Sequence, residues 1–266
     1  AFPFQYYNIA ITCNYGGRMT MKYLLKTALC LLLCALLSLP ALAEEGEELT
    51  CGDYTYVLLE DGGARITGYD GEDAELTVPD ELDGHPVREI GDDAFSSCVS
   101  LTTITLPDSL TTIGDGAFYI CVSLTTVTLP DSLTTIGDNA FYNCHALTTI
   151  TLPDGLTTIG DGAFYICESL TTVTLPDSLT TIGDYAFSNC ESLTTITLPD
   201  SLTTIGYGAF SRCYSLTTVT LPEGLASIGT NPFISCDSLE KIDVSPDHPV
   251  FEQIDGVLYE KATKTL

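Results

Sequence analysis

Residues 101–123 carry the sequence LTTITLPDSLTTIGDGAFYICVS, and five further copies of this unit follow without a gap. The later copies begin at Leu124, Leu147, Leu170, Leu193 and Leu216. The period is therefore 23 residues, and it is kept up to Ser238. A fixed period of about 20–30 residues is typical of solenoid proteins, in which each unit stacks on the next. The sequence therefore predicts a repeat β-solenoid.

One repeat predicts two short strands. Residues 103–106 alternate between threonine and an aliphatic residue, as in a strand that is buried on one side. Pro107 follows, and it ends the strand because proline has no N–H to give to the sheet. Residues 110–113 predict a second extended segment with apolar ends. Stacking the copies would form a parallel sheet of eight strands between Leu76 and Val244, with short strands or helical turns on the other face.

The rest of the repeat predicts a tight turn. Gly114 is expected to adopt a backbone conformation that other residues resist. Asp115 is placed to cap a single helical turn over residues 116–118.

Two apolar columns follow from the period. Phenylalanines recur at positions 95, 118, 141, 164, 187, 210 and 233, and cysteines recur at positions 98, 121, 144, 167, 190, 213 and 236. We favour buried free thiols, because in-register Cβ atoms lie near the rung spacing, which is too far for a disulfide. Disulfides of a secreted protein and a ladder for soft metals are the alternatives.

The segments around the repeats indicate secretion. Residues 21–43 combine a basic start, an apolar run and the small residues Ala41 and Ala43, which is the pattern of a signal peptide cleaved after Ala43. Residues 1–20 do not fit ahead of such a signal, and we interpret them as a non-native leader. Residues 44–75 are expected to form an N-terminal β-hairpin cap, residues 76–244 the repeats, and residues 245–266 a C-terminal cap that is truncated.

The charge of the chain limits its partners. The net charge is −27, and all 36 aspartates and glutamates follow residue 43. Such a charge excludes nucleic acid as the natural partner and argues against an anionic membrane surface. We expect no membrane insertion of the mature chain. A basic partner, or one bridged by cations, is favoured instead.

Two surfaces are candidate binding faces. The first consists of two threonine columns, which should face solvent on the parallel sheet: Thr103, Thr105, Thr126, Thr128, Thr149, Thr151, Thr172, Thr174, Thr195, Thr197, Thr218 and Thr220. The alternative face is a tyrosine strip near the turn: Tyr119, Tyr142, Tyr165, Tyr185 and Tyr207. The threonines are equally compatible with simple β-propensity, and some of the tyrosines with packing between rungs.

Other candidate sites are weaker. The acidic column that follows each proline, from Asp80 to Glu223, is interpreted as a solvated edge that blocks aggregation, with calcium binding as the alternative. His85, His145 and His248 are scattered and are expected on the surface. No nucleophile, phosphate loop or metal-ligand motif is present in the sequence. We therefore expect no enzyme, no cofactor and no metal site.

The unit L-x-x-I-x-L-P-x-x-L-x-x-I-G-x-x-A-F-x-x-C is similar to the BspA-like, treponemal-type leucine-rich repeat. Residues 64–69 and the insert at 83–87 resemble that family's first repeat, and residues 254–259 its C-terminal region. The resemblance covers about residues 54–266. It implies a curved, right-handed leucine-rich-repeat superhelix on secreted or surface proteins of bacteria, with adhesion to host matrix proteins or other cells in some members. It carries no catalytic residues.

We therefore expect a secreted or cell-surface bacterial protein that binds an extracellular protein or glycan, and host matrix proteins are candidate ligands. Attachment to a cell would use a region beyond Leu266. The alternative is a structural spacer that only separates other domains of a larger surface protein. A more distant alternative is ice or mineral binding through the threonine columns.

Overall fold

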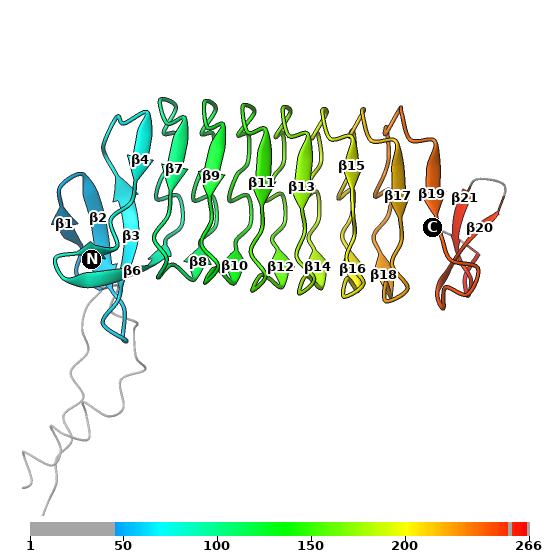
Figure 1. Ribbon diagram of the computed structural model, residues 1–266, viewed down its shortest axis with the longest axis horizontal. Coiled ribbons are helices and arrows are strands. Elements are labelled where there is room, and N and C mark those ends of the chain that lie inside the picture. Colours follow the sequence, from blue (N-terminus) through cyan, green and yellow to red (C-terminus); the bar gives the residue numbers. More distant parts are fainter. Residues whose placement is uncertain (1–45, 255–256, 265–266) are drawn as a thin grey trace, which may run out of the picture. The chain divides into compact units, whose positions relative to one another are not determined.

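The computed structural model describes residues 46–254 and 257–264 of the chain. The predicted leader and signal peptide, with cleavage after Ala43, lie outside these residues. The described part is a parallel β-solenoid whose rungs follow one another along the sequence (Figure 1). The predicted fold class is confirmed, and the 23-residue period sets the register: Thr112 pairs with Thr135, and Thr135 pairs with Thr158.

Eight strands lie on the side of the threonine columns, and the six from β7 to β17 carry them. They are β4 (Glu75–Thr77), β7 (Thr103–Thr105), β9 (Thr126–Thr128), β11 (Thr149–Thr151), β13 (Thr172–Thr174), β15 (Thr195–Ile196), β17 (Thr218–Thr220) and β19 (Lys241–Asp243). The predicted single sheet is divided in two, β4-β7-β9 and β11-β13-β15-β17-β19. At the break between β9 and β11, the Thr148 N–H donates to the Thr125 carbonyl over a long 3.4 Å.

A second parallel sheet lies at the other extended segment of each rung. Its members are β6 (His85–Ile90), β8 (Thr112–Ile113), β10 (Thr135–Ile136), β12 (Thr158–Ile159), β14 (Thr181–Ile182), β16 (Thr204–Ile205) and β18 (Ser227–Ile228). The isoleucine of each two-residue strand from β8 to β16 is buried, and the threonine before it is exposed or half-buried. A turn connects the two sheets within each rung. In the first repeat it is closed by a hydrogen bond from the Leu110 N–H to the Pro107 carbonyl at 3.1 Å.

The third side of each rung contains no helix in the described residues, so the predicted helical turn over residues 116–118 is wrong. Alternate N–H groups point to the next rung instead. The Phe118 N–H donates to the Ala140 carbonyl at 2.7 Å, and Ile120 donates to Tyr142 at 2.8 Å. Because hydrogen bonds to the next rung satisfy these N–H donors, no helix is needed to pair them.

The glycine that begins this turn is required for a different reason than predicted. Gly114 does not have a positive φ. A Cβ atom on Gly114 would lie 2.8 Å from the backbone of Gly91, and one on Gly160 would lie 2.6 Å from the backbone of Gly137. The preceding rung therefore leaves no room for a Cβ atom at this corner, and glycine is required there.

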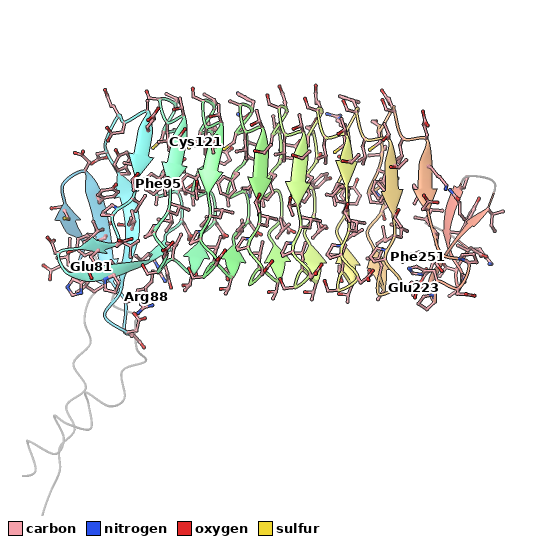
Figure 2. The ribbon with its side chains drawn as sticks, viewed as in Figure 1. Glu81, Arg88, Phe95, Cys121, Glu223 and Phe251 are labelled. Atoms are coloured by element: carbon pink, nitrogen blue, oxygen red, sulfur yellow. The ribbon has the colours of Figure 1, made fainter. Side chains whose placement is uncertain are left out.

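The phenylalanine column forms a continuous stack in the core. Ring centroids from Phe95 to Phe233 are 5.1–5.6 Å apart, and adjacent rings are within 14° of parallel. Tyr69 and Tyr54 extend the stack into the N-terminal segment, with spacings of 5.3 and 5.1 Å. The Phe95 and Cys121 side chains lie within the solenoid (Figure 2). No rung could bury these side chains without its neighbours.

The N-terminal segment joins the second sheet. Strands β1 (Leu49–Cys51), β2 (Tyr54–Leu58) and β3 (Ala64–Tyr69) are antiparallel, and β3 then pairs parallel with β6. Strand β5 (Glu81–Leu82) turns back onto β6 through Asp83 and Gly84, which both have positive φ. The Tyr56 hydroxyl donates to Asp83 at 2.9 Å and so ties the first hairpin to this turn.

The C-terminal hairpin, β20 (Phe251–Ile254) and β21 (Val257–Glu260), is fixed by a histidine. His248 is fully buried, which corrects the expectation that it lies on the surface. Its Nε2 lies 3.0 Å from the Pro222 carbonyl, and its Nδ1 accepts from the N–H groups of Val250 and Phe251. This imidazole therefore joins the last rungs to the hairpin.

Candidate binding surfaces

The threonine face is exposed but almost featureless. Thr126, Thr128 and the later threonines of both columns are exposed, whereas Thr103 and Thr105 are half-buried. A hollow of about 670 Å³ lies at its last rungs, where Thr220, Asp243 and Glu223 contribute to the lining. The structure places all twelve predicted threonines on one surface, and their role in binding stays a prediction.

The tyrosine strip lies on the third side of the rungs and is partly stacked. The Tyr119 and Tyr142 rings are 4.6 Å apart at 18°, and Tyr142 and Tyr165 are 5.2 Å apart at 24°. The stack breaks at the next rung, where Tyr165 and Tyr185 are 6.2 Å apart and nearly perpendicular. Tyr207 continues the strip beside Tyr185. The break arises because the column of Tyr119, Tyr142 and Tyr165 continues with a serine, the buried Ser188. The tyrosine of that rung, Tyr185, lies three residues earlier in the sequence.

A row of aspartates runs parallel to the tyrosines, and its role was not predicted from the sequence. The Oδ1 atom of each aspartate accepts a hydrogen bond from the backbone N–H one rung later, at 2.6–2.9 Å. The row consists of Asp92, Asp115, Asp138, Asp161 and Asp184. Asp115 therefore bonds to the next rung rather than capping a helix in its own. The repeat of this aspartate every 23 residues was the signal that pointed to a ladder.

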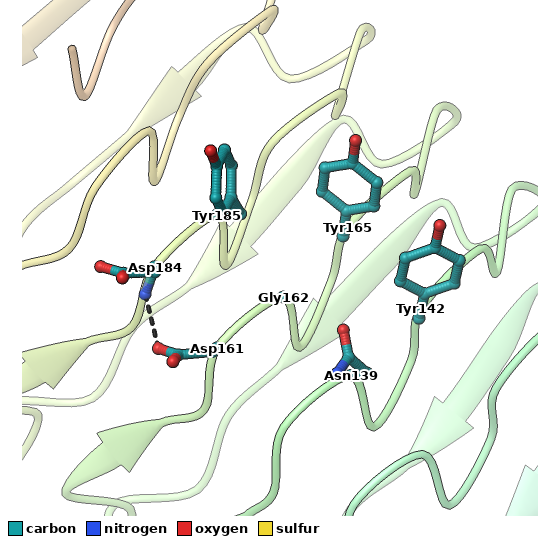
Figure 3. A pocket seen from close by; sticks show the side chains of 7 residues that line it. All are labelled: Asn139, Tyr142, Asp161, Gly162, Tyr165, Asp184 and Tyr185. Carbon is teal, nitrogen blue, oxygen red and sulfur yellow. Dashed lines mark hydrogen bonds between the residues drawn. The ribbon is translucent and has the colours of Figure 1, made fainter. Parts of the chain in front are cut away.

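Two hollows lie between the aspartate row and the tyrosine strip. One has a volume of about 510 Å³ and is lined by Asn139, Gly162 and Tyr185 together with Tyr142, Tyr165, Asp161 and Asp184 (Figure 3). The other has a volume of about 440 Å³ and is lined by Asp93, Gly116, Tyr119 and Asn139 together with the aspartates of the row, Asp92, Asp115 and Asp138. Asn139 lines both hollows, so they are parts of one groove.

The cysteine column consists of free thiols in the described residues. Each Sγ from Cys121 to Cys236 donates to the carbonyl of the phenylalanine 26 residues earlier, at 3.1–3.3 Å. Burial raises the pKa of Cys167 to about 12 and that of Cys98 to about 11. The neighbouring Cys213 thiol instead lowers the pKa of Cys236. These thiols are inert packing groups, apart from the half-buried Cys236 at the end of the column.

Within the described residues, no group of three or more histidines, cysteines, aspartates or glutamates is arranged to hold a metal ion. Residues 46–254 and 257–264 also form no helix that is long and apolar enough to cross a membrane.

Comparison with known proteins decides the family. The sequence profile of the BspA type leucine rich repeat region matches residues 88–190 and 157–255, with six copies of the repeat. The chain belongs to this family. The match covers most of the 23-residue repeats, and the resemblance seen in the sequence is confirmed. No curated protein matches the chain.

Solved structures agree with this assignment. The T. pallidum leucine-rich repeat protein is 36% identical with a TM-score of 0.67, and the match covers 73% of this chain and 91% of that one. A leucine rich cell surface protein of Faecalibacterium prausnitzii A2-165 is 31% identical with a TM-score of 0.60 over 84% of this chain. The chain spans only 60% of the length of that second protein. The described rungs thus have bacterial relatives, one of which is named a cell surface protein.

Proposed function

We propose that this BspA-type protein is a non-enzymatic binding protein of the bacterial surface, and that it recognises an extracellular protein or glycan. The observation that carries the proposal is the groove between the aspartate row and the tyrosine strip. It is a concave surface with aromatic side chains and exposed polar groups, which is the usual composition of a recognition site. The family membership and the cell surface relative support a location outside the cell.

The groove is favoured over the threonine face as the binding surface. Its lining changes from rung to rung, with Asn139, Gly162 and Tyr185 at equivalent positions. The threonine strands repeat the same residues, and so present a uniform surface. Specific binding needs differences along the surface, because near-identical rungs would bind a ligand equally well in several registers.

An array of immobilised matrix proteins and glycans tests the proposal. The purified chain is applied at low and high salt, together with two double variants. We expect saturable binding that weakens with salt and is lost in Tyr142→Ser/Tyr165→Ser but kept in Thr149→Gln/Thr151→Gln. The opposite pattern would assign binding to the threonine face. No binding to any ligand would favour the structural spacer, and thermal hysteresis without a protein ligand would favour ice binding.

A further inference from the structure

The two hollows of the groove repeat along the solenoid for a local structural reason. The residue after each aspartate of the row has a positive φ, and this column reads Asp93, Gly116, Asn139, Gly162 and Tyr185. Gly116 lines one hollow and Gly162 the other, and each packs against the Asp93 or Asn139 side chain of the rung before, whose Oδ1 would lie 2.5 Å from a Cβ atom. The hollows are therefore two rungs apart. The Tyr119, Tyr142 and Tyr165 rings beside the hollows are 4.6 and 5.2 Å apart, so two rungs on this side span at most about 9.8 Å.

The groove has the chemistry of a site for cations. The aspartates of the row are exposed, and each uses Oδ1 to accept only a backbone hydrogen bond. The four ion pairs among the described residues all lie elsewhere: Arg65–Glu89, Arg88–Asp61, Lys241–Asp243 and Lys264–Glu252. The carboxylates are thus not neutralised by the protein itself. A basic partner would relieve the repulsion between them.

The spacing of the hollows selects one shape of partner. In a β-strand, side chains on one face are about 6.6–6.8 Å apart, which fits neither one rung nor two. In a polyproline II helix, every third residue is on the same side, and the repeat is about 9.3 Å. That repeat matches the two-rung distance. Grooves lined by aromatic side chains are also the usual sites for polyproline II segments.

We propose that the groove binds an extended polyproline II segment that carries arginine or lysine at every third position. The basic side chains occupy the hollows at Gly116 and Gly162 and face the aspartate row. The residues between them pack on the tyrosine strip, above all where the Tyr165 and Tyr185 rings stand nearly perpendicular. The proposal rests on the binding function above and specifies its ligand.

A neutral glycan fits the groove less well. Sugars stack on the open faces of aromatic rings, but Tyr119, Tyr142 and Tyr165 largely cover one another's faces. The aspartate row would gain no charge complement from a neutral ligand. Charge and ring geometry therefore both favour the basic peptide.

Titration calorimetry with a Pro-Pro-Arg repeat peptide tests the proposal. The matched peptide has the same composition, with its arginines at alternate positions. We expect the first peptide to bind at least about tenfold more tightly, because only its arginines reach both hollows. Equal affinity would overturn the fit between the peptide and the two-rung period.

Three variants localise the site. Asp161→Asn/Asp184→Asn keeps both Oδ1 acceptors and removes two charges, and it should weaken binding by about tenfold or more. Asp154→Asn/Asp177→Asn removes two exposed charges from the same rungs on the proline turns, and it should change Kd by less than about twofold. Gly162→Asn introduces the residue that the same column holds at Asn139 and Asn231, also with positive φ. Its Cβ would lie 2.5 Å from Asn139 Oδ1, so the Asn139 side chain must move into the hollow and obstruct it. This variant should weaken binding while the fold is retained.

Each remaining outcome contradicts the proposal. An equal loss in both aspartate pairs would mean that general charge, not the groove, holds the peptide. No peptide binding, while the chain still binds ligands on the array, would refute this ligand and leave the binding function standing. A neutral glycan whose binding is abolished by Gly162→Asn would replace the peptide as the occupant.

Discussion

At the scale of single residues, a serine in four of the proline turns ties its rung to the rung before. Ser109 Oγ donates to the Val87 carbonyl at 2.7 Å, and Ser178 Oγ donates to the Leu156 carbonyl at 2.6 Å. Two rungs have glycine at this position, Gly155 and Gly224. Their surroundings differ, and so a serine should have opposite effects at the two sites.

We expect Gly155→Ser to raise the free energy of unfolding by about 1 kcal/mol. A Cβ atom there would lie 3.3 Å from the Leu133 carbonyl, so the hydroxyl can form the same bond as in other rungs. At Gly224 the Cβ atom would lie 2.6 Å from the Asp200 carbonyl, and serine should destabilise. Urea unfolding of both variants and of Gly155→Ala checks this. If Gly155→Ala stabilises as much as serine, the gain comes from chain entropy and not from the hydrogen bond.

Ile166 is strained, because its φ is +61° and its side chain is β-branched. The same column holds Asn143 and Asn189 with nearly the same φ. The left-handed conformation costs such a residue about 1–2 kcal/mol, and asparagine tolerates it better. We therefore expect Ile166→Asn to raise the melting temperature, although the half-buried isoleucine loses some packing. Ile166→Ala loses the packing with less relief, so it should be less stable than Ile166→Asn. The reverse order would contradict the strain.

At the scale of elements, the C-terminal hairpin depends on one buried imidazole. Replacing His248 by alanine leaves the Pro222 carbonyl and the N–H groups of Val250 and Phe251 without their partner. Each unpaired buried group costs about 1–3 kcal/mol. We expect His248→Ala to release strands β20 and β21 first. Hydrogen exchange should accelerate in residues 245–264 while the phenylalanine stack stays protected.

His85→Ala is the matched control, because the imidazole of His85 is more exposed and contacts only the Gly62 carbonyl at 3.0 Å. It should leave exchange nearly unchanged in both regions. Uniform acceleration over all rungs in His248→Ala would mean that the hairpin and the rungs unfold as one unit.

The repeating elements could be predicted from the sequence, since a strict period determines which residues become neighbours. The phenylalanine column is an example. The conformation of the third side could not be predicted from the sequence. An aspartate beside a glycine, such as Asp115 beside Gly116, fits a helix cap as well as a hydrogen bond to the next rung. In the segments before and after the repeats, no period shows which residues become neighbours. Tyr69 thus gave no sign that it extends the aromatic stack, and His248 gave none that it is buried. The groove could not be predicted because it lies between the aspartate ladder, which was not recognised, and the tyrosine strip.

At the scale of the whole described solenoid, the core contains a column of thiols that stay protonated when the chain is folded. Cys144, Cys167, Cys190 and Cys213 are almost completely buried. Burial raises the pKa of Cys167 and, together with the charge of the Cys167 thiolate, that of Cys190. Hydrogen bonds with neighbouring thiols, and then burial, raise the pKa of Cys144 and Cys213. For Cys167 the pKa is raised from 9.0 to about 12. In the unfolded chain these thiols ionise above pH 9, whereas in the folded chain they keep their protons. The folded state therefore binds more protons in this range, and its stability falls as pH rises.

We expect a steep loss of stability between pH 9 and the raised pKa values, and no such loss below pH 9. Each fully buried thiol contributes at most about 1.4 kcal/mol per pH unit. The carboxylates are already ionised in both states at this pH, so they do not add to the slope. Urea unfolding at pH 8, 9 and 10 measures it. Cys167→Ala/Cys190→Ala should be less stable at every pH but lose about two fifths of the slope, since two of the five thiols with a raised pKa no longer titrate. An unchanged slope in this variant would show that other groups cause the alkaline unfolding, for which Tyr54 is the first candidate because burial raises its pKa to about 12.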